Sequence, residues 1–198
     1  MENDLQKYVD LLCEIKGRKI IINNLDINGT QKYHDINVES AYLQIRKILE
    51  LIAFGSLVSN IDIYSKEYEN FSKFWNAERM LKDMKKVNSR FYPEPQAQKE
   101  SDREGIKHDL IELDEKEYLN TEEFVKLYKK CGAIMHADNP YGSKVDYCFY
   151  RKAIPNWIEK INALLNVHKI QLVGDENLYL VRMRSNNEAP ICTIFEPV

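Results

Sequence analysis

The chain has 198 residues, of which 44% are hydrophobic and 30% charged, with only 7 glycines and 6 prolines. This composition is typical of an ordered globular protein and excludes collagen-like, low-complexity and wholly disordered chains. The formal net charge is −3, so the chain as a whole lacks the basic excess of non-specific nucleic-acid binders. No apolar stretch approaches the roughly 20 residues of a membrane span, and the N-terminus lacks a signal-peptide pattern, so we expect no membrane association.

Charge and cysteine are unevenly distributed. Residues 93–123 hold 11 acidic and 4 basic side chains, which leaves the remainder neutral to mildly basic and able to present a local basic face. The four cysteines are scattered without a CxxC pair: Cys13, Cys131, Cys148 and Cys192. This spacing favours free, mostly buried thiols in a reducing cytoplasm over a disulfide framework or a zinc site.

Two long helices are predicted in the first third of the chain. Apolar residues recur at a helical period from Leu5 to Ile22, which predicts an amphipathic helix. A more apolar helix is predicted from Val38 to about Asn60, and its wide apolar arc indicates a central position in the fold. On that helix Arg46 and Glu50 are one turn apart, close enough to pair or to bind a ligand together.

A third helix is predicted from Ser72 to Asn88, followed by an acidic region. One side of this helix carries a basic stripe of Arg79, Lys82, Lys86 and Arg90. The stripe is either a solvated helix face or a surface that follows a phosphate backbone. Residues 94–118 are polar and acidic, and we expect them to form an exposed loop or insertion.

The last two helices precede a change of period. A capping residue, Asn120, starts the fourth helix, and a turn at residues 138–142 is expected to end it. The fifth helix is expected to hold Pro155 in its first turn. After His168 the apolar period changes to two, in short runs at residues 170–173, 178–185 and 191–195, which predicts an antiparallel meander.

These elements predict a mainly α fold class, a helical bundle of about five helices with a small C-terminal antiparallel β meander. The bundle is expected to span residues 1–168, with residues 94–118 as a loop or insertion. The meander is expected to span residues 169–198 and to pack on the bundle.

The end of the fourth helix carries the main candidate site. Lys129 and His136 are seven residues apart and therefore share a helix face, with Lys130 beside them in sequence. Gly132 lies between them, and a glycine in mid-helix costs roughly 0.5–1 kcal/mol relative to alanine. That cost indicates the close approach of another backbone or of a ligand.

A central helix containing Arg46 and Glu50, followed by a helix with a basic residue, a glycine and a histidine, resembles the HEPN superfamily of small α-helical domains. Members that are metal-independent ribonucleases carry an arginine, four to six residues and then a histidine at a dimer interface, and many work in toxin–antitoxin pairs or phage defence. The resemblance implies that His136 is the catalytic histidine and that Lys129 or Lys130 takes the place of the arginine. Lysine keeps the charge but lacks the planar fork of arginine.

The resemblance implies a bacterial or phage-type cytoplasmic protein that binds or cleaves RNA. It further implies a homodimer, a protein partner such as an antitoxin, and no metal or cofactor. In such a site histidine transfers protons near neutral pH. A cation, here Lys129, Lys130 or Arg46, stabilises charge on the phosphate. Binding residues are then expected among Arg46, Glu50, Asn139, Arg79, Lys82 and Lys86.

Three alternatives remain open. His136 is, in the first, a helix-end residue that interacts with the helix dipole, with Asn139 capping beside it. The second makes the chain a non-catalytic helical interaction module that binds a partner protein or a nucleotide. In the third, the chain is a structural or regulatory subunit whose meander adds a strand to a partner's sheet.

Overall fold

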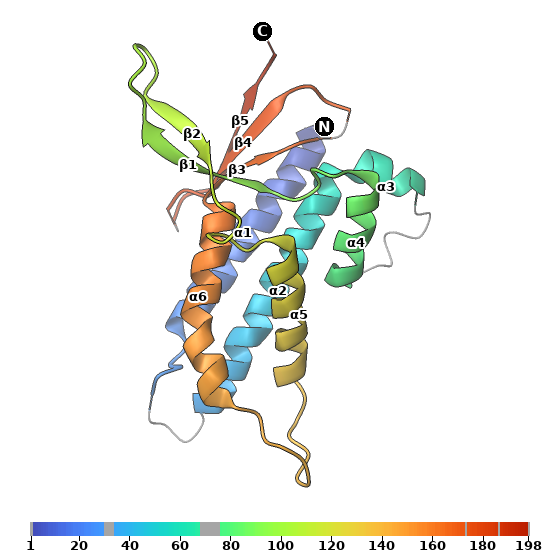
Figure 1. Ribbon diagram of the computed structural model, residues 1–198, viewed down its shortest axis with the longest axis vertical. Coiled ribbons are helices and arrows are strands. Elements are labelled where there is room, and N and C mark those ends of the chain that lie inside the picture. The colour runs from blue at the N-terminus through green and yellow to red at the C-terminus, as the bar shows by residue number, and fades with distance from the viewer. Residues whose placement is uncertain (1, 30–33, 68–75, 173, 186, 198) are drawn as a thin grey trace.

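The structure is a computed structural model that describes residues 2–29, 34–67, 76–172, 174–185 and 187–197. Within these residues six helices form a bundle, and a five-stranded antiparallel sheet lies across one end of it (Figure 1). The helices are α1 (Glu2–Asn24), α2 (His34–Ser59), α3 (Ile61–Glu67), α4 (Ala77–Val87), α5 (Thr121–Ile134) and α6 (Tyr147–Leu165). The strands are β1 (Glu94–Glu100), β2 (His108–Glu112), β3 (Val167–Ile170), β4 (Leu178–Arg182) and β5 (Ile191–Phe195).

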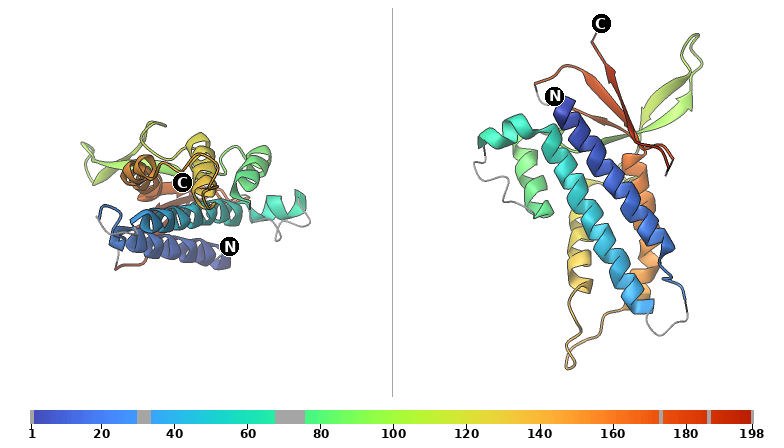
Figure 2. Two further views of the ribbon diagram at one scale, coloured as in Figure 1. Left: turned by 90° about the horizontal axis from the view of Figure 1, so that it is seen from below. Right: turned by 180° about the vertical axis from the view of Figure 1, so that it is seen from behind.

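Helix α2 is the centre of the bundle. It contacts α1, α4, α5 and α6, and the two views of Figure 2 show these helices around it. Its fully buried side chains include Val38, Ala41, Tyr42, Ile45, Ile48 and Leu49. The wide apolar arc of this segment requires neighbours on more than one side, and the predicted central position is confirmed.

The predicted fold class was wrong about the sheet, which is larger than a C-terminal meander. The strand order is β2-β1-β3-β4-β5, so a hairpin from residues 94–112 extends the meander on one side. These residues were predicted to form a loop because they are polar, acidic and poor in apolar side chains, and so cannot bury enough surface to offset the entropy of ordering. Only Glu94 and Pro95 of β1 pair with β3, and the rest of the hairpin pairs with itself beyond the sheet. Its strands therefore depend on backbone hydrogen bonds and on opposite charges such as Lys99 across from Asp109, without burying an apolar face.

Several helix boundaries differ from the sequence prediction. The short helix α3 was not predicted, and residues 72–75 of the predicted third helix lie outside the described residues. Asp146 caps α6, so the helix begins a full two turns before Pro155, which lies in its interior. The exposed Pro155 ring is tolerated there at the loss of one backbone hydrogen bond. None of the described helices combines the length and apolarity needed to cross a bilayer.

Two buried polar contacts join α1 to the sheet. Tyr8 Oη lies 2.8 Å from His168 Nε2, and His168 Nδ1 lies 2.9 Å from the Leu165 carbonyl oxygen. Because a carbonyl oxygen only accepts, Nδ1 carries the hydrogen and Tyr8 donates to Nε2. Farther along α1, Lys16 is 5% exposed and donates to the carbonyl oxygen of Met183 at 3.0 Å. Lys16 also donates to the carbonyl oxygens of Ser185 and Glu188.

Candidate functional site on the α2–α5 face

The Arg46 side chain is held in place by contacts with Tyr128 and Glu50. Its guanidinium lies over the Tyr128 ring, with Cζ 4.3 Å from the ring centroid. Nη2 donates to Tyr128 Oη at 2.9 Å, and Nε donates to Glu50 Oε1 at 3.2 Å. The α2–α5 face, defined here by Arg46, Glu50, Tyr128 and Gly132, therefore holds a guanidinium in one orientation, and the predicted Arg46–Glu50 pair is confirmed.

Gly132 makes room for that guanidinium. A Cβ atom at Gly132 would lie 3.3 Å from Arg46 Nη1, closer than most side-chain contacts in proteins. The glycine of the fourth helix thus allows the close approach of an arginine from α2, where the sequence predicted a backbone or a ligand. The Arg46 side chain is 29% exposed, so solvent still reaches part of it.

Tyr128 and Cys131, which lie near Arg46, stay protonated at neutral pH. Burial raises the pKa of Tyr128, although the charge of Arg46 opposes this shift. Burial also raises the pKa of Cys131 to about 12, which makes this thiol a poor nucleophile. Cys131 is buried as expected, but Cys13 and Cys148 are exposed, so the prediction of mostly buried thiols was wrong.

His136 lies outside helix α5. The helix ends at Ile134 with Met135 as its C-cap, and the His136 ring is exposed in the segment that follows. Among the described residues, no hydrogen bond or ion pair joins His136 to Lys129, Lys130 or Arg46. The exposed ring can therefore meet a ligand or a second chain, and no hydrogen bond or ion pair from the described part of the chain orients it.

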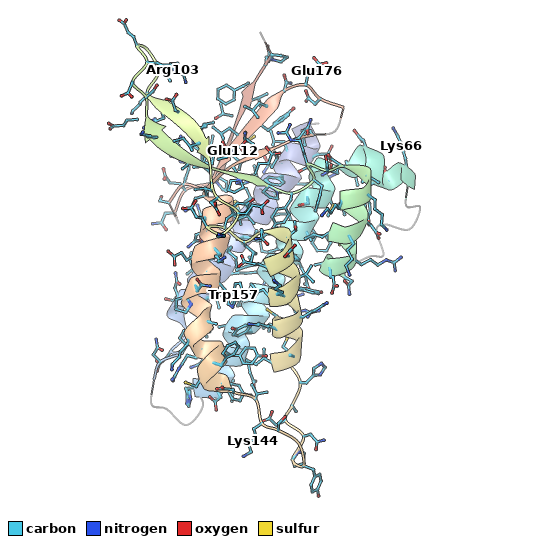
Figure 3. The ribbon with its side chains drawn as sticks, viewed as in Figure 1. Lys66, Arg103, Glu112, Lys144, Trp157 and Glu176 are labelled. Atoms are coloured by element: carbon cyan, nitrogen blue, oxygen red, sulfur yellow. The ribbon has the colours of Figure 1, made fainter. Side chains whose placement is uncertain are left out.

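Asn139 shapes the loop after α5 and does not cap the helix. Its Oδ1 accepts a hydrogen bond from the Tyr141 backbone N–H at 3.0 Å, and its carbonyl oxygen accepts from Gly142 at 2.9 Å. The loop projects from the end of the bundle opposite the sheet, where Figure 3 labels Lys144. Asn139 therefore has a structural explanation in a tight turn, and its side chain is directed to that turn.

The two lysines of α5 point to different neighbours. Lys129 Nζ lies 3.4 Å from Glu78 Oε1 on α4. Lys130 Nζ lies 4.7 Å from the Phe149 ring centroid and 5.6 Å from that of Trp157, which Figure 3 labels on α6. Consecutive residues on a helix are about 100° apart, and the two ammonium groups accordingly reach different helices, α4 and α6. They do not form one site together.

The basic stripe of α4 is interleaved with carboxylates. Lys82 pairs with Glu78 at 2.7 Å, whereas Lys86 and Arg79 lie 2.9 Å and 3.6 Å from Asp83. Hydrogen bonds from Lys82 and Lys129 lower the pKa of Glu78. The stripe is therefore largely neutralised along its length, which weakens its case as a phosphate-binding surface.

Sequence reasoning missed Tyr128 as a positioning residue for Arg46. The available signal was its spacing of four residues from Gly132, which puts both on one face of α5.

Sequence reasoning also missed a cavity of about 460 Å³ between the end of α4 and the base of the hairpin. That cavity is lined by both basic and acidic side chains, including Lys85, Arg90, Glu112 and Glu115, and it shares no residue with the α2–α5 face. No group of His, Cys, Asp or Glu side chains suited to a metal ion occurs among the described residues.

Removal of the Tyr128 hydroxyl is expected to loosen Arg46 with a small loss of stability. Tyr128→Phe keeps the ring under the guanidinium but removes the acceptor of Nη2, which costs about 1 kcal/mol. Urea unfolding measures this difference. Tyr118→Phe, on a half-buried tyrosine outside the face, is the matched control and is expected to have a smaller effect.

Comparison of this chain with protein-family models, curated proteins and solved structures finds no match. The resemblance to the HEPN superfamily therefore stays a prediction from the sequence. The homodimer and the antitoxin partner that this resemblance implies are likewise predictions.

Proposed function

We propose that this chain is a HEPN-like RNA-binding protein that contacts phosphate groups through the α2–α5 face, with His136 acting in metal-independent cleavage. The observation that supports this function is the Arg46 guanidinium, held by Glu50 and Tyr128 and placed against Gly132. Arg46 takes the role of the phosphate cation that the sequence left open between Arg46, Lys129 and Lys130. An arginine suits that role better than a lysine because its fork matches two phosphate oxygens.

The orientation of Arg46 reduces the entropy that binding would cost. Glu50 accepts from Nε and Tyr128 accepts from Nη2, so Nη1 on the Gly132 side remains for a ligand. Lys47 Nζ lies 3.3 Å from Glu50 Oε2, so the face and Lys47 together carry one more positive than negative group. A phosphate that approaches from solvent meets a cation already in position.

Cleavage would use the exposed imidazole of His136. A base removes the proton of the RNA 2′-hydroxyl, whose oxygen attacks the adjacent phosphorus. The bond from phosphorus to the 5′-oxygen then breaks, and that oxygen takes a proton from an acid. The products are a 2′,3′-cyclic phosphate and a free 5′-hydroxyl. The His136 imidazole would take the 2′-hydroxyl proton as the base and then give it to the 5′-oxygen as the acid.

A second candidate function is the non-catalytic interaction module. The observation that favours it is the exposure of His136 without an orienting partner among the described residues. General acid–base catalysis needs a group within hydrogen-bond reach of the proton that it moves. In this case the face binds a nucleotide or a partner protein and leaves it chemically unchanged.

The two functions are separated by incubating the chain with labelled single-stranded RNA in the presence of a chelator. We expect binding that Arg46→Lys weakens by about tenfold or more, through loss of a charge-assisted contact. We also expect cleavage that His136→Ala abolishes while binding is kept. The products are identified by their cyclic phosphate ends.

Matched controls lie on the hairpin, away from the face. His108 is an exposed histidine on β2, and Lys99 is an exposed cation on β1. Neither His108→Ala nor Lys99→Ala is expected to change binding or cleavage. Binding of RNA or of a mononucleotide without cleavage by the wild type would support the second candidate, whereas absence of RNA binding would contradict the first.

A further inference from the structure

Strand β5 is an edge of the sheet without the usual protection against pairing. It is the last strand in the order β2-β1-β3-β4-β5, and no described strand pairs with its outer side. Its sequence, Ile-Cys-Thr-Ile-Phe, contains no charge and no proline. Edge strands in monomers are usually interrupted by charges, proline or a bulge, because their free N–H and C=O groups bind other strands.

Large apolar side chains are exposed along this edge on both faces of the sheet. Ile191 is 42% exposed and Phe195 is 46% exposed on one face, and Ile194 is 48% exposed on the other. Leu178, directly across from Phe195 on β4, is 36% exposed and extends the apolar surface of the first face. An added strand would cover these side chains and pair the free backbone groups together.

We propose that β5 pairs antiparallel with β5 of a second copy of this chain, about a two-fold axis at Thr193. In this register Thr193 lies opposite the same residue of the second copy, Ile191 lies opposite Phe195, and Cys192 lies opposite Ile194. All five residues of the strand are paired and apolar side chains meet apolar side chains. A shift of the axis by one residue toward the C-terminus would bring Glu196 opposite Cys192.

The other edge of the sheet is a poorer partner for β5. Strand β2 reads His-Asp-Leu-Ile-Glu, so it would bring ionisable groups among the apolar side chains of β5. If β5 of one chain paired with β2 of another, the joined sheet would still have an unpaired β2 at one end and an unpaired β5 at the other. Further chains could add at both ends, and the assembly would grow into an open fibre. Pairing of β5 with itself closes after two chains and joins the two sheets into one.

A charge at the two-fold axis tests the interface by sedimentation velocity over a range of protein concentrations. The wild type is expected to be dimeric. Thr193→Lys and Thr193→Glu each place like charges opposite one another and are expected to raise the dimer Kd by more than about tenfold. An equimolar mixture of the two variants is expected to restore the dimer, because the charges are then opposite. The control Ile111→Lys, at a position 46% exposed on β2, is expected to stay dimeric.

A cross-linking variant covers the case in which a charge at this position prevents folding. Thr193→Cys changes the side chain little and brings two thiols together at the axis. Directly opposed residues have Cα atoms about 4.5–5.5 Å apart, within the range of a disulfide. In a Cys13→Ser, Cys148→Ser background, which removes the two exposed native thiols, oxidation is expected to give a covalent dimer linked at residue 193, and Ile111→Cys is expected to give none. A monomeric wild type, or a dimer that persists in both charge variants, would overturn the proposal.

Discussion

Acidification from pH 6.5 to pH 4 is expected to destabilise this protein by up to ~3 kcal/mol through His168 alone. Burial lowers the pKa of His168 to about 4. The unfolded chain takes up the same proton near pH 6.5. Between these values the unfolded state binds more protons than the folded state, so the free energy of unfolding falls as the pH falls.

The structural cause is the enclosure of His168 between α1 and the sheet. The side chain is 0% exposed, its Nδ1 donates to the Leu165 carbonyl oxygen, and its Nε2 accepts from Tyr8. If the ring were protonated at Nε2 as well, the new N–H would face the Tyr8 hydroxyl oxygen, and no water could solvate the charge of the imidazolium. Burial also strongly raises the pKa of Tyr8, so this hydroxyl stays protonated and cannot neutralise the imidazolium.

Urea unfolding of the wild type and of His168→Phe at a series of pH values measures this contribution. The variant loses two hydrogen bonds and is expected to be less stable at pH 7, but its stability should change less between pH 6.5 and 4. The difference of slopes isolates His168 from carboxylates such as Glu94, whose pKa is lowered by Arg90. His108→Phe, on an exposed histidine, serves as the control. Equal slopes for wild type and His168→Phe would exclude His168 as the titrating group.

Replacement of Lys16 is expected to destabilise the segment that connects β4 to β5, because this segment would no longer be bonded to α1 through Lys16. Its ammonium donates to three backbone carbonyl oxygens, those of Met183, Ser185 and Glu188. Lys16→Met keeps the length of the side chain but leaves these acceptors without a donor, at a cost of about 1 kcal/mol each. We therefore expect a loss of about 3 kcal/mol in the free energy of unfolding.

Hydrogen exchange locates the effect of Lys16→Met in the chain. Amides of β4 and β5 are expected to exchange faster, whereas those of α2 keep their protection relative to global unfolding. Lys7→Met, on the same helix at an exposed ion pair with Asp4, is the control and is expected to change stability by less than about 0.5 kcal/mol. A loss of protection spread evenly over α2 and the sheet would contradict a local role for Lys16.

The same two residues connect the stability of the fold with the proposed dimer. Lys16 and His168 hold the meander against α1, and β5 is the outer strand of that meander. Lys16→Met is therefore expected to weaken β5 pairing together with local protection. Thr193→Lys is expected to weaken pairing alone.

Much of the helical layout follows from the sequence because helix periodicity is a local property. The long apolar arc of α2, the cap at Asn120 and the pairing of Arg46 with Glu50 depend on residues within a few turns of one another. The β1–β2 hairpin did not follow, since its strands bury little apolar surface and leave no period of two. The interior position of Pro155 did not follow either, because proline is favoured in a first turn, and the prediction therefore placed the start of the helix too late.

For the candidate site, the sequence by itself determined which residue types were present on α5: two lysines, a glycine and a histidine within eight positions. Only the tertiary structure decided that Gly132 receives Arg46, that Lys129 and Lys130 diverge to α4 and α6, and that His136 lies beyond the helix. It likewise decided that Tyr8, Lys16 and His168 join α1 to the sheet across more than 150 residues of chain. Local patterns specify the conformation of a segment, whereas the partner of a polar side chain is set by which distant segments pack against it.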